Sequence, residues 1–180
     1  MGSINTKSPK IHLEITRLNS TNCVLIGFMG SGKSTIAKAL HQINHALVLD
    51  SDSIIESNEG LSIKEIFSLY GEKYFRDLEC KFCQFIAHNV QNAIISTGGG
   101  MPLFCDVQSM GKVFFLHLEF EKILSRFNAE ERNQRPLFQN DDSALELYNT
   151  RLKHYQSCAH YVINADQSIQ AITQEILEKL

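Results

Sequence analysis

One eight-residue motif constrains the fold of this chain more than any other feature of its sequence. Residues 27–34 are Gly-Phe-Met-Gly-Ser-Gly-Lys-Ser, which match the pattern G-x-x-x-x-G-K-[ST] without a gap. The apolar residues 23–28 predict a strand before the motif, and residues 33–43 predict a helix after it. A glycine-rich turn between strand and helix directs backbone N–H groups and the positive helix end toward one place. The motif therefore predicts a site for the phosphates of a nucleoside triphosphate.

Each residue type in this motif has a physical task. Glycines allow the tight turns that direct N–H groups inward, and Lys33 brings a mobile positive charge to the β- and γ-phosphates. The Ser34 hydroxyl can bind Mg²⁺. The alternative is a glycine turn without a ligand, which the full match in this context disfavours. We expect ATP and Mg²⁺ as cofactors, with phosphate-binding residues Gly30, Ser31, Gly32, Lys33, Ser34 and Thr35.

Short apolar stretches alternate with helical patterns along the rest of the chain. Strands are predicted at residues 45–50, 112–119 and 161–165, and residues 92–100 predict a buried strand that runs into a glycine triplet. Helices are predicted at 62–70, 74–91 and 120–127, from the capping acids Asp141 and Asp142 to about Ala159, and from Ser168 onward. With the first strand, this order predicts a three-layer α/β/α fold containing a five-stranded parallel sheet. Ligands of such sheets bind beyond the carboxyl ends of the strands.

The length of 180 residues suits a single domain, which we place at residues 22–180. Residues 1–21 are polar and are interpreted as an N-terminal arm, either native or in part a cloning remnant. The alternating residues 11–18 within this arm are compatible with an added edge strand or with a loosely attached segment. Residues 128–140 are polar and charged without an apolar stripe, which predicts a loop.

Composition excludes several classes of partner. A formal net charge of −3 provides no basic surface for nucleic acid. No apolar run approaches the roughly 18 residues of a membrane span, and no secretory signal opens the chain. We therefore expect a cytoplasmic protein that acts as a monomer on a small molecule, without a nucleic-acid or membrane partner.

The five cysteines are scattered and odd in number, which is typical of free thiols in a reducing cytosol. Cys80 and Cys83 form a C-x-x-C pattern, but a zinc site would need a second pair at ligand spacing. Residues 74–90 around this pair have the pattern of one continuous helix. We interpret both thiols as buried or partly buried helix residues.

Motifs after the phosphate loop separate the classes of nucleotide-binding protein. A GTPase would carry a base-reading N-K-x-D, whereas residues 164–167 are Asn-Ala-Asp-Gln. A motor or transport ATPase would normally be larger. Its second acidic motif would not follow the first helix as directly as Asp50 and Asp52 do here. A small-molecule kinase is the class that remains.

Five further motifs stand in a fixed order along the chain. They are Leu-Asp-Ser-Asp at 49–52, Arg76 within 71–79, Ser-Thr-Gly-Gly-Gly at 96–100, Arg-Pro-Leu at 135–137 and residues 151–159. Together with the phosphate loop they resemble shikimate kinase, from about residue 22 to the C-terminus. The resemblance implies a nucleoside-monophosphate-kinase-like fold. It also implies ATP-dependent phosphorylation of the 3-hydroxyl of shikimate, giving shikimate 3-phosphate and ADP on the route to chorismate and the aromatic amino acids.

The resemblance assigns residue roles that suit a ligand with a carboxylate and ring hydroxyls. It implies that Arg76 and Arg151 hold the carboxylate and that Asp52 accepts from the ring hydroxyls and faces the attacking one. Glu79, one helical turn after Arg76, would hold that arginine in place. Asp50 would bind Mg²⁺ through water, together with Ser34. The glycines without Cβ atoms that would approach the ring are Gly98, Gly99 and Gly100.

The polar stretch 128–140 corresponds to a mobile lid in the family. The resemblance implies that Arg135 reaches the transferred phosphoryl group, which makes Lys33, Asp52 and Arg135 the catalytic candidates. Arg132 is a second candidate for the task of Arg135. Arg126, just before the lid, would lie against adenine, because a planar guanidinium stacks well on a ring.

Other interpretations stay open at this point. The acceptor could be that of a related small kinase, such as gluconate or a nucleoside monophosphate, or the chain could be a nucleotide-binding module without catalysis. Asp50 and Asp52 could simply cap a helix, and Arg76 with Glu79 could be a solvated pair. Arg151 could be an exposed helix charge.

Overall fold

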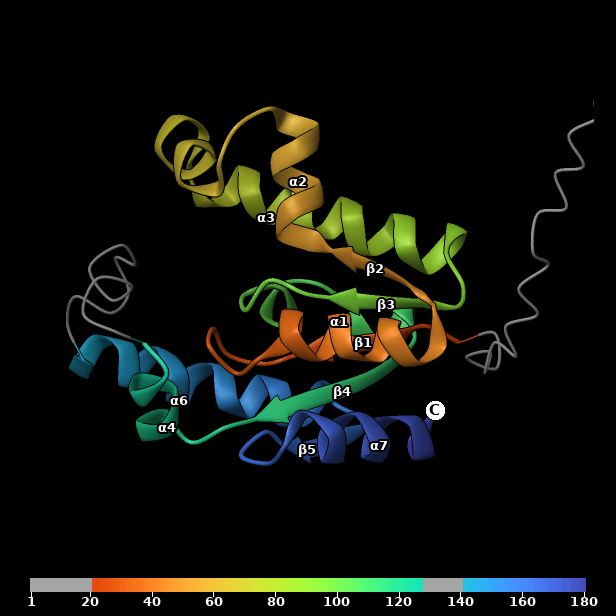
Figure 1. Ribbon diagram of the computed structural model, residues 1–180. Coiled ribbons are helices and arrows are strands. Elements are labelled where there is room, and N and C mark those ends of the chain that lie inside the picture. Colours follow the sequence, from red (N-terminus) through yellow and green to blue (C-terminus); the bar gives the residue numbers. More distant parts are fainter. Residues whose placement is uncertain (1–20, 128–140) are drawn as a thin grey trace, which may run out of the picture.

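The computed structural model of the protein describes residues 21–127 and 141–180 (Figure 1). A five-stranded sheet lies at its centre, with all neighbouring strands parallel and in the order β2-β3-β1-β4-β5. The strands are β1 (Cys23–Ile26), β2 (Leu47–Asp50), β3 (Ala93–Ser96), β4 (Lys112–His117) and β5 (Tyr161–Asn164). This confirms the predicted α/β fold and its five-stranded parallel sheet. The predictions for the arm at 1–20 and for the lid at 128–140, with Arg132 and Arg135, lie outside the described residues.

Helices cover both faces of the sheet (Figure 1). Contacts of α1 with α7 place these two helices side by side over one face. On the other face, α3 and α6 pack with the 3-10 segments η1 (Met101–Leu103) and η2 (Val107–Met110). The α-helices are α1 (Lys33–Asn44), α2 (Ser51–Glu59), α3 (Ile63–Asn89), α4 (Phe120–Ser125), α6 (Asp141–Cys158) and α7 (Ile169–Lys179). Within the described chain, none of the helices combines the length and apolar character that a membrane span requires.

The central strands form the core because their residues are apolar on both faces. All four residues of β1 are fully buried, as expected for a strand with neighbours on both sides and helices above and below. Phe114 of β4 and Ile95 of β3 flank it and are also inaccessible. Truncation of such a side chain to alanine typically costs about 2–5 kcal/mol, so this core is a rigid platform for the loops at its edge.

Several element ends differ from the predicted ones for local reasons. β1 ends at Ile26 rather than at residue 28, because Gly27 turns the chain with a φ of 147°. β3 ends at Ser96, and the glycine triplet follows the strand as predicted. The helices predicted at 62–70 and 74–91 form one element, α3, with a break at Gly71 (φ 80°, ψ 172°). Glycine accepts that backbone conformation without a Cβ clash, so the helix changes direction there.

Parallel strands bring distant parts of the sequence to one edge. The carboxyl ends of β2, β3 and β4 point to the same side of the sheet (Figure 1). The turn at residues 27–32, the acids Asp50 and Asp52, and the glycines at 98–100 follow β1, β2 and β3 there. The candidate site is therefore a product of the sheet topology.

Candidate active site

The turn between β1 and α1, residues 27–34, is called here the phosphate cradle. Gly30 and Gly32 adopt left-handed conformations with φ of 80° and 101°, which a residue with a Cβ rarely accepts. Side chains cap the N-termini of α2, α3 and α7, but among the described residues none caps α1, whose N-cap is Gly32. A helix N-terminus without a side-chain cap is suited to binding an anion through its backbone N–H groups. Within the described chain the buried Ser31 hydroxyl also has no hydrogen-bond partner.

Lys33 and Ser34 lie where the motif predicts charge and a metal ligand. The Lys33 ammonium donates to the carbonyls of Gly27 (2.7 Å) and Phe28 (3.1 Å), which holds its charge over the cradle. The Ser34 hydroxyl donates to Asp50 Oδ2 at 3.3 Å. Asp50 Oδ1 accepts from the Ser53 N–H at 3.2 Å and thereby caps α2. One carboxylate thus serves as helix cap and as partner of the cradle hydroxyl.

The Ser34–Asp50 pair fits a magnesium ion that is also bound by phosphate. Within residues 21–127 and 141–180, no group of three or more His, Cys, Asp or Glu side chains is arranged to hold a metal. Mg²⁺ does not need one, because it commonly takes one or two protein oxygens and completes its shell with phosphates and water. Ser34 and Asp50 supply such oxygens at the wall of the cavity.

Arg126 joins the cradle to the far edge of the sheet. Its Nη1 donates to the carbonyls of Gly30 (3.1 Å) and Ser31 (3.2 Å), and its Nη2 donates to Ala165 O at 2.9 Å. The guanidinium plane is therefore fixed between the phosphate turn and the loop after β5. This position beside the cradle is compatible with the predicted stacking on adenine, although the stacking itself stays a prediction.

Asp52 lies in the first turn of α2 and faces the glycines after β3. The Ser51 hydroxyl donates to Asp52 Oδ1 (3.2 Å) and accepts from the Gly98 N–H (2.8 Å), so Ser51 connects α2 to β3. Burial raises the pKa of the Asp52 carboxyl, and the charge of Asp50 adds to this effect. The charge of Lys33 and the hydrogen bond from Ser51 oppose it. The result is a carboxylate with more basic character than a solvated one.

Arg76 is held between two acids of its own helix, α3. Its Nη1 donates to Glu79 Oε2 at 2.6 Å, while Nε and Nη2 both donate to Glu72 Oε1 at 3.1 and 2.8 Å. The two acids differ in environment, because the side chain of Glu72 is 59% exposed whereas that of Glu79 is 1% exposed. Burial acts to lower the pKa of Arg76, but the two carboxylates outweigh it and raise the pKa. A guanidinium in this setting is permanently charged.

Two buried polar groups near Arg76 lack partners among the described residues. They are Glu79 Oε1, an acceptor, and Arg151 Nε, a donor. Arg151 belongs to α6 and lies beneath Phe28, with its Cζ 5.7 Å from the ring centroid. Burial raises the pKa of Glu79, against the hydrogen bond and the charge of Arg76. An unmade buried hydrogen bond costs about 1–3 kcal/mol, so this arrangement fits a ligand that supplies both an acceptor and a hydroxyl. Arg76, Glu79 and Arg151 are called here the arginine cluster.

The three glycines after β3 are packed against these same groups. A Cβ on Gly98 would lie 2.6 Å from Asp52 Oδ1 and 2.9 Å from Glu79 Oε1. One on Gly99 would lie 3.3 Å from Arg151 Nη1, and one on Gly100 would collide with the Arg76 guanidinium. The missing side chains therefore leave room for the charged groups. This explains on steric grounds why glycine occupies all three positions of the predicted triplet.

A cavity of about 620 Å³ lies between the phosphate cradle, the acids Asp50 and Asp52, and Gly99. Its walls include cradle residues, both acids at the end of β2, Thr97, Gly99 and Arg126. The structure thus brings together the predicted residues of the cradle, the acids and the glycines, with the arginine cluster directly behind the glycines.

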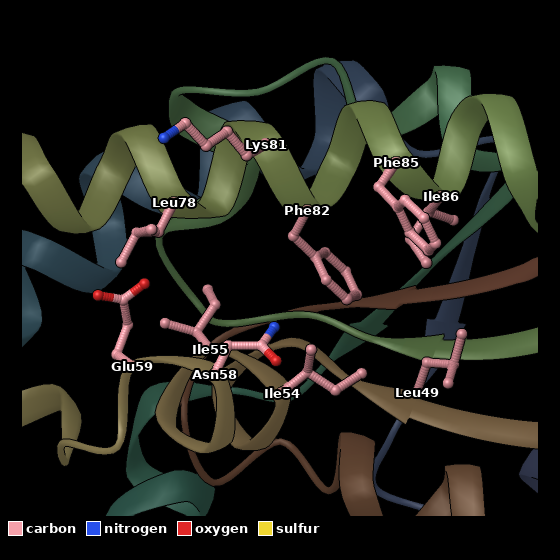
Figure 2. Close-up of a pocket in the computed structure, with 10 residues that line it drawn as sticks. All are labelled: Leu49, Ile54, Ile55, Asn58, Glu59, Leu78, Lys81, Phe82, Phe85 and Ile86. Atoms are coloured by element: carbon pink, nitrogen blue, oxygen red, sulfur yellow. The ribbon is translucent and has the colours of Figure 1, made fainter.

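A second cavity, of about 370 Å³, has a different character. It lies between α2, α3 and β2, and aliphatic and aromatic side chains such as Ile55, Phe82 and Ile86 point into it (Figure 2). Glu59 and Lys81 lie among its lining residues, and none of the residues predicted for chemistry does. Its apolar walls offer no cradle for phosphate, so the candidate active site is the first cavity.

Comparison with known proteins decides the family. The family model for shikimate kinase matches residues 29–180. A shikimate kinase of Helicobacter hepaticus is 46% identical over 157 residues, which cover 87% of this chain and 94% of that protein. The chain belongs to the shikimate kinase family. The sequence-based identification of a P-loop kinase with shikimate kinase activity is thereby confirmed.

Solved structures agree with this assignment at the level of the fold. The structure of shikimate kinase from Acinetobacter baumannii in complex with shikimate has a TM-score of 0.78 and 29% sequence identity. The alignment covers 89% of this chain and 93% of that one. Deoxyadenosine kinase from M. mycoides with bound dATP has a TM-score of 0.61 at 14% identity, with 88% and 98% of the two chains covered. At that identity it shows a shared fold alone, in keeping with the predicted nucleoside-monophosphate-kinase-like architecture.

Sequence reasoning missed three residues that support the site. The Tyr155 hydroxyl donates to Gly99 O at 2.6 Å, Ser51 connects Gly98 to Asp52, and Glu72 holds the outer edge of Arg76. Tyr155 stands four residues after Arg151, so a shared helix face could have indicated it. Ser51 lies between the two predicted acids, but nothing in the sequence distinguishes its hydroxyl from that of Ser53.

Proposed function

We propose that this protein transfers the γ-phosphoryl group of ATP to the 3-hydroxyl of shikimate in the cavity between the phosphate cradle and the arginine cluster. The observation that carries this proposal is the pairing of unsatisfied groups. A buried N–H of Arg151 and a buried oxygen of Glu79 lack partners among the described residues, and the two side chains pack against adjacent glycines of the triplet. Shikimate offers a carboxylate and hydroxyls to such groups. A nucleoside monophosphate has no carboxylate for the two arginines. Gluconate has one, and membership of the shikimate kinase family favours shikimate over it.

In this proposal the arginines position the acceptor. Arg76 is oriented by Glu79 from the buried side, and Arg151 by its packing beneath Phe28. Both guanidinium groups would bind the carboxylate of shikimate, for which their fork of donors is suited. Because Glu72 occupies the outer edge of Arg76, the substrate carboxylate either takes its place there or binds to the remaining N–H groups.

Asp52 would accept a hydrogen bond from the 3-hydroxyl and direct that oxygen toward the cradle. The raised pKa of Asp52 also makes it a better proton acceptor than a solvated carboxylate, which suits a role as general base. Lys33 would leave the carbonyls of Gly27 and Phe28 to follow the transferred group, and the bare N-terminus of α1 would bind the phosphates. Mg²⁺ bound at Ser34 and Asp50 would neutralise charge on the phosphate oxygens. Arg135 as a further phosphoryl ligand stays a prediction.

Phosphoryl transfer is largely a matter of position and charge, so these groups account for most of what the reaction needs. The direct test is ADP release by the purified protein with ATP and Mg²⁺, given shikimate, gluconate or nucleoside monophosphates in parallel. Of these acceptors, we expect only shikimate to cause ADP release. NMR of the product should find the phosphate on the 3-oxygen. A folded sample that turns over gluconate instead, or none of these compounds, would contradict the proposal.

A further inference from the structure

Two thiols lie next to each other between α3 and the segment that follows η1. Cys80 belongs to α3, and Cys105 lies between η1 and η2. Their Sγ atoms are 2.7 Å apart, compared with about 2.0 Å in a disulfide bond. The Cys80 thiol also donates to Phe104 O at 3.4 Å. Little movement therefore separates this pair from a covalent bond.

The backbone holds both sulfur atoms in this position. The N–H of Cys105 donates to Met101 O at 3.0 Å, and its carbonyl accepts from Val107 N at 3.0 Å. One turn along α3, the Cys83 thiol donates to Asp106 O at 3.2 Å and fixes the same segment against the helix. The contact between the thiols thus follows from two anchored segments.

The other cysteines are less suited to reaction. Cys23 is fully buried and Cys83 is 3% exposed, whereas Cys80, Cys105 and Cys158 are partly exposed. The thiol of Cys158 donates to Tyr155 O on its own helix. Of the thiols in the described chain, Cys80 and Cys105 combine access to solvent with an adjacent sulfur.

The position of the pair relates it to substrate binding. Cys80 directly follows Glu79 in the chain and stands one helical turn after Arg76, so it shares the face of α3 that carries Arg76. Cys105 directly follows Phe104, whose ring centroid lies 4.6 Å from Arg76 Cζ. A bond between the two sulfurs would therefore link the chain next to Glu79 with the chain next to Phe104, and both of these residues contact Arg76.

We infer that Cys80 and Cys105 are a modification site, oxidised by hydrogen peroxide to a reversible disulfide that weakens shikimate binding. The reaction consumes one peroxide and releases two waters. The Cys80 sulfur attacks a peroxide oxygen, the O–O bond breaks, and the leaving hydroxide takes a proton to become water. The Cys105 sulfur then attacks the resulting sulfenic acid, the S–O bond breaks, and a second hydroxide leaves as water.

The order of these steps follows from the environment of Cys105. Burial raises the pKa of the Cys105 thiol, and the adjacent Cys80 adds to this effect. The raised pKa keeps the Cys105 thiol protonated near neutral pH, where it is a poor nucleophile, so the first attack on peroxide is assigned to Cys80. The partner of Cys80 is already in contact, so the sulfenic acid is consumed before further oxidation.

Closing the bond must draw the two sulfurs together by several tenths of an ångström. Glu79 and Phe104 are adjacent to the two cysteines, so this movement displaces the groups that orient Arg76. A misplacement of about 1 Å can cost about 100-fold in rate, so a smaller shift is expected to cost less. We expect oxidation to raise the KM for shikimate about 10-fold, with a change in the KM for ATP of less than about twofold, because the cradle is not connected to the pair.

The experiment treats the full reduced chain with hydrogen peroxide and follows two readouts. Peptide mapping by mass spectrometry without reductant is expected to find residues 80 and 105 linked within one chain, with the loss of two hydrogens. Kinetics on the same sample should show the higher KM for shikimate, and dithiothreitol should restore the original value. The kinetic part rests on the proposed role of Arg76, whereas the cross-link does not, so the two readouts separate these claims.

Two variants provide the controls. Cys105→Ser is expected to form no cross-link, and its KM for shikimate should be insensitive to peroxide. Cys158→Ser, which removes another partly exposed thiol, should behave as the wild type. Peroxide treatment that oxidises Cys158 without linking residues 80 and 105 would overturn the inference. A complete cross-link with an unchanged KM, or a peroxide-dependent KM in Cys105→Ser, would do so as well.

Discussion

The phosphate cradle and the arginine cluster solve two binding problems in different ways. The cradle takes its donors from eight consecutive residues, mostly as backbone N–H groups at a helix end that no described side chain caps. The arginine cluster instead takes its donors from side chains on α3 and α6, which are 75 residues apart between Arg76 and Arg151. It depends on the glycines after β3 for space. Phosphate is thus bound by local geometry, and the acceptor by tertiary packing.

This difference determines what each region tolerates. A cradle formed by backbone atoms depends on its glycines for its conformation. Side-chain chemistry matters most at Lys33 and Ser34, where the side chain itself binds. In the arginine cluster each side chain is oriented by another, as Glu79 orients Arg76. Substitutions in the cradle should therefore lower the rate of transfer, whereas substitutions in the cluster should mainly change the KM for shikimate.

The largest effect is expected for Lys33→Met. The side chain keeps its length but loses the charge that follows the transferred group. Removal of one such contact from a preorganised site costs about 10²–10³-fold in turnover, and we place Lys33 at the upper end, near 10³-fold. Steady-state ADP release measures this. The KM for shikimate should change by less than about threefold, and a large change in it would break the separation between the two regions.

Asp52→Asn should lower kcat by about 10²-fold, the lower part of the range for general acid–base groups. The same variant tests how the ionisation of Asp52 affects the stability of the fold. Because burial raises the pKa of Asp52, the folded state binds a proton more tightly than the unfolded chain. Ionisation of Asp52 therefore costs stability, and the cost appears as the pH rises from about 4 through the raised pKa.

The asparagine variant lacks this cost. Its Tm at pH 7 should equal or exceed that of the wild type, and the difference should shrink toward pH 4. Thermal unfolding at a series of pH values measures it. A variant that keeps wild-type kcat would remove Asp52 from the mechanism, and a variant with a much lower Tm would show that the acid serves folding instead.

Arg151→Ala is expected to raise the KM for shikimate about 30-fold, the cost of about 2 kcal/mol for a lost hydrogen bond to a charged group. The KM for ATP should stay within about twofold. Lys153→Ala, on the exposed side of the same helix, is the matched control and should leave both constants unchanged. If ATP binding collapsed and shikimate binding did not, Arg151 would belong functionally to the cradle.

The smallest changes in the KM for shikimate are expected for substitutions of the two acids that hold Arg76. Glu79→Gln removes a buried charge partner and should raise the KM for shikimate about 10-fold. Glu72→Gln removes an exposed partner, whose pairing contributes little, and should change it by less than about twofold. Equal effects of the two variants would contradict the view that the buried side orients the guanidinium.

The same difference explains how far the sequence could predict the molecule. The cradle residues follow from one contiguous motif, and helix starts such as Ser62 and Ser168 follow from capping side chains. Strand ends were less accurate, because a strand and the glycine turn after it look alike in an apolar run. Gly27 and Phe28 were predicted as strand for this reason.

Contacts between distant segments lie beyond what the sequence reveals. The roles of Arg76 and Arg151 came from a family resemblance, but their relation to Gly98–Gly100 depends on how α3 and α6 pack against β3. The approach of Cys105 to Cys80 was likewise not predicted, since the C-x-x-C pattern draws attention to Cys83 instead. Contacts of this kind depend on how distant segments pack together, and the periodicity of apolar residues in the sequence does not predict that.

The central claim is that the acceptor lies between the arginine cluster and Asp52, with its hydroxyl facing the cradle. A crystal structure with shikimate and a non-hydrolysable ATP analogue tests it most directly. We predict the shikimate carboxylate within about 3.2 Å of N–H groups of both Arg76 and Arg151, and the 3-hydroxyl within the same distance of Asp52. A carboxylate bound away from both arginines, or a 3-hydroxyl turned away from Asp52, would contradict the account.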